Sequence, residues 1–237
     1  MKELTARAFI EQLSLLKSSS ELKNVQRFFR DENPNNKFIG VRMSNIFGHA
    51  KQSIEMPVAE IEKLLQSDYY EARMGAVSIM DFQARNKKTT AARKKELFDL
   101  YIKRHDKINN WDLVDRSAPY VVGGYLYDKS RKVLYQLAKS NNVWERRTAI
   151  VSTYFFIRQN DVSDTFKIAE ILVNDQHDLI QKAVGSWIRE AGKKDKLALI
   201  EFLDSYVATM PRTMLRYAIE KFDKKEKEYY LKIRTNQ

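Results

Sequence analysis

The chain has 237 residues, and 42 Lys plus Arg outnumber 31 Asp plus Glu, which gives a net charge of +11 at pH 7. A positive surface excess favours a polyanionic partner without identifying it. Cysteine is absent, which excludes disulfides, thiolate nucleophiles, Cys-ligated zinc and iron–sulfur clusters. The 7 glycines and 4 prolines are too few for the tight turns of a many-stranded β protein, so the composition predicts an all-α fold.

The N-terminal segment 1–13, MKELTARAFIEQL, is amphipathic rather than a secretory signal, and no apolar run approaches the roughly 20 residues that span a bilayer. We therefore expect a cytoplasmic protein without a membrane partner. Breaks between elements are predicted at 33–36, at Gly123-Gly124 and at Met210-Pro211. None of them is long or polar enough for a linker, so the sequence predicts a single domain over residues 1–237.

A small residue followed by a branched apolar one recurs at Ala76-Val77, Ala149-Ile150, Ala183-Val184 and Ala218-Ile219. The last three pairs are 34 and 35 residues apart, and the middle of the longer first gap falls on Leu113-Val114. Periods of roughly 34 to 47 residues are typical of solenoids in which each helical hairpin buries its apolar stripe by stacking on its neighbours. The spacing predicts a HEAT-like α-solenoid of stacked helical hairpins.

The segment 85–107 holds nine Lys or Arg against three acidic residues, a local net charge of +6. One interpretation is a solvated helix face, and the other is a strip that follows a phosphate backbone. Both interpretations stay open from the sequence alone.

The motif NNWDLVD, residues 109–115, places Trp111 and Asp115 four residues apart and hence on one helix face. Asn109 or Asn110 can cap this helix, and Asp112 then falls in its first turn near the positive end of the helix dipole. Capping does not explain Asp115. A carboxylate and an indole face both attract a cation, so this pair suits a reaction that develops positive charge.

A second aromatic and charged cluster, NNVWERRTAI, occupies residues 141–150. Trp144 begins a helical apolar stripe, so we expect it in the core. Of Arg146 and Arg147, at most one can face the same surface as Asp115, and the other is expected to face solvent or phosphate.

The segment 179–189 shows helical periodicity, with an apolar face that includes Trp187. Lys182, Ser186 and Arg189 share the opposite face, which is either a solvated surface or the lining of a concave surface. The C-terminal segment 223–237 is predicted to be a last helix that fades into a tail.

Other familiar sites are missing from the sequence. His49, His105 and His177 lie far apart without metal-ligand spacing, and the glycines form neither GxGxxG nor a P-loop. We therefore expect no metal and no cofactor.

These motifs together resemble the AlkD family of DNA alkylation repair glycosylases, which are HEAT-like-repeat proteins. The match rests on NNWDLVD (109–115), NNVWERRTAI (141–150) and LIQKAVGSWIRE (179–190), in the family's order and spacing, and covers nearly the whole chain. The resemblance implies a C-shaped solenoid whose basic concave face holds duplex DNA. It also implies hydrolysis of the N-glycosidic bond of cationic N3- and N7-alkylated purines, such as 3-methyladenine and 7-methylguanine, in base excision repair. Separately, we expect a monomer. The lesion would stay largely stacked rather than flipped into a pocket.

Carried over residue by residue, the resemblance gives Asp115 the role of catalytic carboxylate, Trp111 that of an indole at the sugar, and Arg147 that of an arginine at the DNA backbone. An alkylated purine is already a good leaving group, so no strong general acid is needed. Asp115 would stabilise an oxocarbenium-like deoxyribose and place a water. Phosphate contacts are expected from Lys182, Arg189, Arg212 or Arg216, which the sequence does not rank, with Ser186 on the same helix face as Lys182 and Arg189.

One departure from the family concerns its second cleft tryptophan, which follows the glycine of the third motif directly. Here Gly185 is followed by Ser186, and Trp187 comes one position later. A shift of one residue rotates a helical side chain by about 100°, so Trp187 as a second aromatic wall is in doubt. This departure keeps open a paralogue that binds DNA structure without excision, and a protein-binding HEAT scaffold remains a further alternative.

Overall fold

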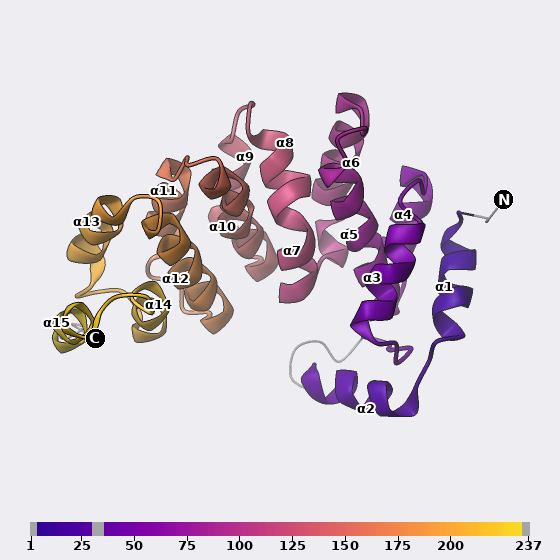
Figure 1. The fold of residues 1–237 in the computed structure, drawn as a ribbon, viewed down its shortest axis with the longest axis horizontal. Helices are drawn as coiled ribbons and strands as arrows, with labels where there is room; N and C mark the ends of the chain where they lie inside the picture. The colour runs from indigo at the N-terminus through magenta and orange to yellow at the C-terminus, as the bar shows by residue number, and fades with distance from the viewer. Residues whose placement is uncertain (1–3, 30–35, 234–237) are drawn as a thin grey trace. The chain divides into compact units, whose positions relative to one another are not determined.

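The computed structural model describes residues 4–29 and 36–233, and its regular elements over those residues are helices, with one isolated bridge between Lys37 and Tyr69 (Figure 1). The prediction of an all-α fold of stacked helical hairpins is confirmed. The contacts divide the chain into two compact units, Met1–Tyr125 and Leu126–Gln237. The single domain over residues 1–237 stays a prediction.

In the first unit, α5 is the central helix and contacts α3, α4, α6 and α7. Its elements are α1 (Ala6–Ser14), α2 (Ser19–Phe28), α3 (Met43–Gln52), α4 (Val58–Leu65), α5 (Tyr70–Arg85), α6 (Ala91–Lys103), the 3-10 turn η1 (His105–Lys107), α7 (Trp111–Ser117) and the π-helical turn η2 (Ala118–Gly123). The short α8 (Gly124–Leu126) lies at the boundary of the two units.

The second unit repeats one hairpin pattern, in which α10, α12 and α14 pack side by side and α11 and α13 lie against them. Its helices are α9 (Lys132–Ala138), α10 (Val143–Arg158), α11 (Ser163–Leu172), α12 (Asp178–Gly192), α13 (Lys196–Tyr206), α14 (Arg212–Ala218) and α15 (Lys224–Lys232). Close approach of α12 and α14 requires a glycine, because a Cβ on Gly185 would lie 2.4 Å from the carbonyl oxygen of Met214.

The repeated residue pairs lie where the predicted period requires them. Ala76-Val77 is in α5, Leu113-Val114 in α7, Ala149-Ile150 in α10, Ala183-Val184 in α12, and Ala218-Ile219 at the end of α14. Every one of these residues is at most 3% exposed. The recurring pair therefore marks the buried stripe of successive helices, as expected when each unit gains its core only by stacking.

Two of the predicted breaks fall on described residues, and they differ in outcome. The break at Met210-Pro211 is confirmed, because α13 ends at Tyr206 and α14 begins at Arg212. The break at Gly123-Gly124 is wrong, since α7, η2 and α8 continue one helix from Trp111 to Leu126 and the chain turns only after it. Gly123 is buried there between packed helices, and this packing outweighs the roughly 1 kcal/mol that a glycine costs inside a helix.

Some predictions fall outside the described residues. They are the break at residues 33–35, the first three residues of the N-terminal segment and the tail at 234–237. The last helix itself is present as α15, which begins with a capping box between Asp223 and Glu226.

The loop that leads into α3 is held by a buried carboxylate. Glu71, which is 1% exposed, accepts hydrogen bonds from the backbone N–H of Ile39 at 2.9 Å and of Gly40 at 2.8 Å. Gly40 has φ +88°, which side-chain-bearing residues rarely adopt. This arrangement fixes the positions of Val41 and Met43, which both line the site described below.

Candidate functional site

The motif NNWDLVD forms the start of α7. Asn110 occupies the N-cap position with extended backbone, and its carbonyl oxygen accepts from the N–H of Val114 at 3.2 Å. The prediction that an asparagine side chain caps this helix is wrong for Asn110, whose side chain makes no capping bond and is 1% exposed. Asp112 lies in the first turn, as predicted.

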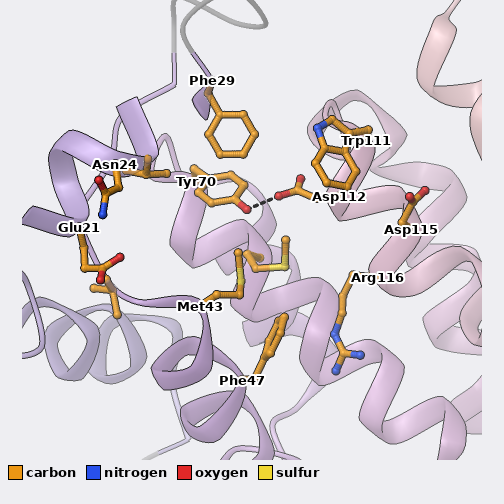
Figure 2. Close-up of a pocket in the computed structure, with 13 residues that line it drawn as sticks. Glu21, Asn24, Phe29, Met43, Phe47, Tyr70, Trp111, Asp112, Asp115 and Arg116 are labelled. Carbon is orange, nitrogen blue, oxygen red and sulfur yellow. Dashed lines mark hydrogen bonds between the residues drawn. The ribbon is translucent and has the colours of Figure 1, made fainter. Parts of the chain in front are cut away.

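Trp111 and Asp115 line the same cavity, as expected of residues four apart on one helix (Figure 2). The cavity has a volume of about 580 Å³ and lies entirely within the first unit. Its lining residues come from five segments of that unit: Glu21, Asn24, Val25, Phe29, Val41, Met43, Phe47, Tyr70, Met74, Trp111, Asp112, Asp115 and Arg116. A carboxylate therefore lies beside a large aromatic surface.

Tyr70 connects the start of α5 to the start of α7. Its hydroxyl donates a hydrogen bond to the Asp112 carboxylate, which Figure 2 marks by a dashed line. Its ring packs against Phe29 with the centroids 4.7 Å apart. Burial raises the pKa of the Tyr70 hydroxyl above its ordinary value, and the negative charge of Asp112 raises this pKa further. Tyr70 therefore stays a neutral donor that fixes the first turn of α7.

Arg116 is the cation in the cavity lining, and a buried acid holds it. Its guanidinium lies 2.9 Å from a carboxylate oxygen of Asp81, whose side chain is 0% exposed. It also lies over the rings of Phe47 and Phe82, 4.8 and 4.7 Å from their centroids. Burial lowers the pKa of Arg116 and raises that of Asp81. The charge of Arg116 is largely committed to Asp81.

The predicted backbone arginine, Arg147, belongs to α10 of the second unit. It is 7% exposed, and its guanidinium donates to the carbonyl oxygen of Leu179 at 2.7 Å. The adjacent Arg146 pairs with Asp175 at 2.6 Å, so it does not extend freely into solvent. Trp144 is half-buried rather than enclosed in the core, because it lies in the first turn of α10.

Four of the remaining candidates lie on α12. Lys182 pairs with Asp178 at 2.5 Å, Arg189 pairs with Glu220, and Ser186 is half-buried. Trp187 packs its ring against that of Tyr154 on α10, with the centroids 4.9 Å apart. The indole therefore has a packing partner inside the second unit.

The two candidates on α14 differ in how they are held. Arg212 donates to the carbonyl oxygens of Leu231 at 2.7 Å and Ile233 at 3.1 Å, which ties α14 to the end of α15. Arg216 is exposed and has no hydrogen bond or ion pair with the described part of the chain. Of this pair, Arg216 is the cation available to an external anion.

Several cations of the basic segment 85–107 form ion pairs with acidic residues of the first unit. The pairs are Arg85–Asp81, Arg93–Glu96, Lys95–Asp99, Lys103–Glu62 and Arg104–Asp106. This pairing favours the interpretation of α6 and its flanks as a solvated face over that of a strip for phosphates.

The histidines have local roles in packing and capping. His49 and His105 are buried, and His177 caps α12 by accepting from the N–H of Leu179 at 3.3 Å. Within residues 4–29 and 36–233, no three His, Asp or Glu side chains gather as a metal site would require. No helix of those residues has the length and apolar character needed to span a bilayer.

Comparison with known proteins agrees with the motifs. The family model of the DNA alkylation repair enzymes matches residues 9–222. The chain belongs to the DNA alkylation repair enzyme family. Among curated proteins, none matches the chain. The chain is also similar to a solved structure described as a predicted DNA alkylation repair enzyme from Enterococcus faecalis, with 17% identity and a TM-score of 0.69 over 88% of this chain and 97% of that one.

Membership of the DNA alkylation repair family confirms the resemblance seen in the three motifs and supports a role in DNA repair, with DNA as the binding partner. The structural likeness, at 17% identity, shows the fold. The roles of individual residues, the monomeric state and the cytoplasmic location stay predictions.

In this DNA alkylation repair protein, the sequence did not point to the cavity or to Tyr70. The cavity residues outside α7 come from α2, α3, α5 and the loop before α3. No motif joins them, and the only available signal was the aromatic content of 26–47 and 69–70, which is equally typical of a core.

Proposed function

We propose that the chain is a DNA glycosylase that hydrolyses the N-glycosidic bond of cationic N3- and N7-alkylated purines in duplex DNA, the first step of base excision repair. One observation carries the proposal: Trp111 and Asp115 lie on one face of α7 and line one cavity. The family's role in DNA alkylation repair supports the choice of substrate.

The chemistry requires little beyond these two side chains. The bond between C1′ of the deoxyribose and the base nitrogen breaks, and its electron pair goes to the base, which loses its positive charge. The sugar becomes cationic, and the Asp115 carboxylate and the Trp111 ring stabilise that charge. Water then adds to C1′ and releases a proton to Asp115 or to solvent. The resemblance implies that the base leaves from within the helix, but the hydrolysis does not depend on that route.

Binding of the DNA backbone is assigned to the second unit. Arg216 is exposed without a described partner, so it is the most available cation among Lys182, Arg189, Arg212 and Arg216. Arg147 is held against the start of α12, so we assign it a fixed position at the backbone rather than a mobile contact. Such contacts orient the duplex without reading its sequence.

The proposal is tested by the release of 3-methyladenine and 7-methylguanine from methylated duplex DNA. We expect release by the wild type and a loss of about 10²-fold or more in Asp115→Asn, because the amide cannot stabilise the cationic sugar. Asp106→Asn is the matched control, since Asp106 is an exposed carboxylate of the same unit that does not line the cavity. An inactive wild type, or an Asp115→Asn variant as fast as the control, contradicts the proposal.

A second candidate is a DNA-structure binder without excision. It is favoured by the contact of Trp187 with Tyr154, which accounts for the indole without a ligand. This candidate predicts tight, salt-dependent binding to duplex or branched DNA together with no base release in the same assay.

A further inference from the structure

A second cavity of the first unit, here called the polar cavity, lies where the end of α5 meets the start of α6. Its volume of about 420 Å³ is within the range of roughly 300 to 1,000 Å³ that is typical of small-ligand sites. It shares no residue with the cavity beside Trp111, and its described lining contains one apolar side chain and no aromatic ring. The lining residues are Ile54, Glu55, Gln83, Asn86, Lys88, Thr89, Thr90 and Arg93. Such a lining favours a small hydrophilic ligand.

One wall of the polar cavity contains a fixed amide with an unused acceptor. Gln83 is 5% exposed, and its Nε2 donates to the carbonyl oxygens of Ile54 at 2.7 Å and Met56 at 2.9 Å. These two bonds determine the orientation of the amide, because a flipped amide would turn its oxygen onto two carbonyl oxygens. Oε1 is buried and accepts no hydrogen bond from the described part of the chain. A buried acceptor needs a donor, and the polar cavity is where that donor can come from.

The same wall also carries an acid. Glu55 lies between the two residues whose carbonyl oxygens hold the Gln83 amide. It is exposed, and its side chain makes no ion pair or hydrogen bond within residues 4–29 and 36–233. A carboxylate and an amide oxygen side by side suit an ammonium group, which has three N–H donors and no acceptor.

The donors of the polar cavity come from the start of α6 and the loop before it. Arg93 pairs through Nε with Glu96 at 3.3 Å, but its Nη1 is buried and donates to no described group. Lys88 is exposed, and its side chain has no partner in the part of the chain that the structure describes. Thr90 caps α6, whose first turn contains no acidic residue, so the free N–H groups of that turn add positive potential. These groups suit a carboxylate.

From a buried acceptor beside an acid and a buried donor beside a lysine, we propose that the polar cavity binds a small zwitterion with the chemistry of a free α-amino acid. The ammonium lies at Gln83 Oε1 and Glu55, and the carboxylate lies at Arg93 Nη1, Lys88 and the start of α6. A phosphate in this space leaves Oε1 unpaired and is repelled by Glu55, and a simple ammonium leaves Nη1 unpaired. The inference does not rest on the proposed function, because Trp111 does not line the polar cavity.

The direct test measures binding of the common L-amino acids to the full chain, first by thermal shift at millimolar concentration and then by calorimetry for the tightest one. That amino acid is compared with its amide, which lacks the carboxylate, and with its deaminated acid, which lacks the ammonium. We expect each analogue to bind about ten-fold more weakly, and inorganic phosphate not to compete. Failure of every amino acid to bind overturns the proposal, as does an analogue or phosphate that binds as tightly as the amino acid.

A variant of the donor side tests whether the polar cavity is the site. Lys88→Gln removes a lining cation from an exposed position, so the fold is kept. Lys87→Gln is the matched control, because Lys87 is the exposed neighbour that does not line the polar cavity. We expect Lys88→Gln to bind the amino acid several-fold more weakly, Lys87→Gln to bind it as the wild type does, and both to keep the melting temperature of the free protein. Equal affinities of the two variants contradict the proposed site.

A variant of the acceptor side tests the orientation of the ligand. Glu55→Gln keeps the side-chain volume and removes the carboxylate assigned to the ammonium. We expect several-fold weaker binding of the amino acid and no loss in binding of the deaminated acid, which has no ammonium to lose. Glu170→Gln, at an exposed glutamate of the second unit without a described partner, controls for the change in net charge. Equal losses for the two ligands in Glu55→Gln overturn the proposed orientation.

Discussion

In the first unit, Trp111 and Asp115 border an apolar cavity whose carboxylates outnumber its cations, whereas in the second unit α12 and α14 carry Lys182, Arg189 and Arg216. The carboxylates that line this cavity of the first unit repel a phosphate. The cations on α12 and α14 of the second unit cannot stabilise a positive charge that develops on a sugar. The positive charge of the whole chain is therefore a poor guide to where the proposed bond cleavage would occur.

Two particular ion pairs, one in each unit, differ in burial. In the first unit, Arg116 and Arg85 share the fully buried Asp81. In the second, Lys182 is paired only with Asp178 on the surface of its own helix. Buried pairs maintain shape and are costly to break, while exposed pairs exchange readily with a ligand. We expect variants of Asp81 and of the residues that line the apolar cavity to change stability or rate, and variants of the cations Lys182 and Arg216 to change DNA affinity.

The largest expected effect is that of Asp81→Asn. Removing the carboxylate leaves the half-buried Arg116 without its charge partner, and breaking such a pair costs about 3–5 kcal/mol. We expect a marked loss in the free energy of unfolding, measured by urea denaturation. Asp178→Asn is the control in the second unit, where the exposed pair with Lys182 is worth less than about 1 kcal/mol. Similar losses in both variants would contradict this distinction.

The two tryptophans give the next test, since only one borders the proposed reaction site. Trp111→Ala is expected to slow base release by about 30-fold, which corresponds to about 2 kcal/mol of lost cation–π stabilisation. Trp187→Ala is expected to lower stability through its lost packing on Tyr154 while the rate of release changes little. The single-turnover rate and the melting temperature are measured for both. If Trp187→Ala slowed base release as much as Trp111→Ala, Trp187 would have to act as a second aromatic wall of the reaction site.

Local periodicity was enough to predict much of this molecule. The shared face of Trp111 and Asp115, and the buried pairs from Ala76-Val77 to Ala218-Ile219, follow from the 3.6-residue repeat within a helix and from the period of the hairpins. Both signals depend on residues close in sequence or spaced regularly along it.

The features that the sequence did not predict depend instead on contacts between residues that are far apart in the sequence. The cavity forms because α2 and α3 pack near α7, and the pairing of Arg189 joins it to Glu220, 31 residues away. Gly123 is a local signal for a turn, but burial among packed helices overrides it. The side chain of Asn110, which the local pattern offers as a cap, is buried and makes no capping bond to α7. Tertiary contacts of this kind leave no pattern in a single sequence.

A smaller effect is expected from Tyr70→Phe, which removes the hydrogen bond to Asp112. At neutral pH the variant should be less stable by about 1.5 kcal/mol. The folded state raises the pKa of Tyr70, so its contribution to stability is complete below the unfolded pKa of about 10 and is lost as the pH rises further. The difference in unfolding free energy between wild type and variant should therefore shrink above about pH 10. Urea denaturation across this range measures it, and a constant difference would contradict the assignment.

The smallest effect concerns a single phosphate contact on α14. Arg216→Ala should weaken binding of undamaged duplex several-fold and reduce the slope of log K against log salt by about 1, whatever the sequence of the DNA. Arg212→Ala is the comparison, because that guanidinium is already bonded to the end of α15. It should lower the melting temperature and leave the salt slope unchanged. If Arg212→Ala alone changes the slope, the guanidinium must leave α15 to bind DNA, and availability in the free protein would then be the wrong criterion for ranking the cations of the second unit.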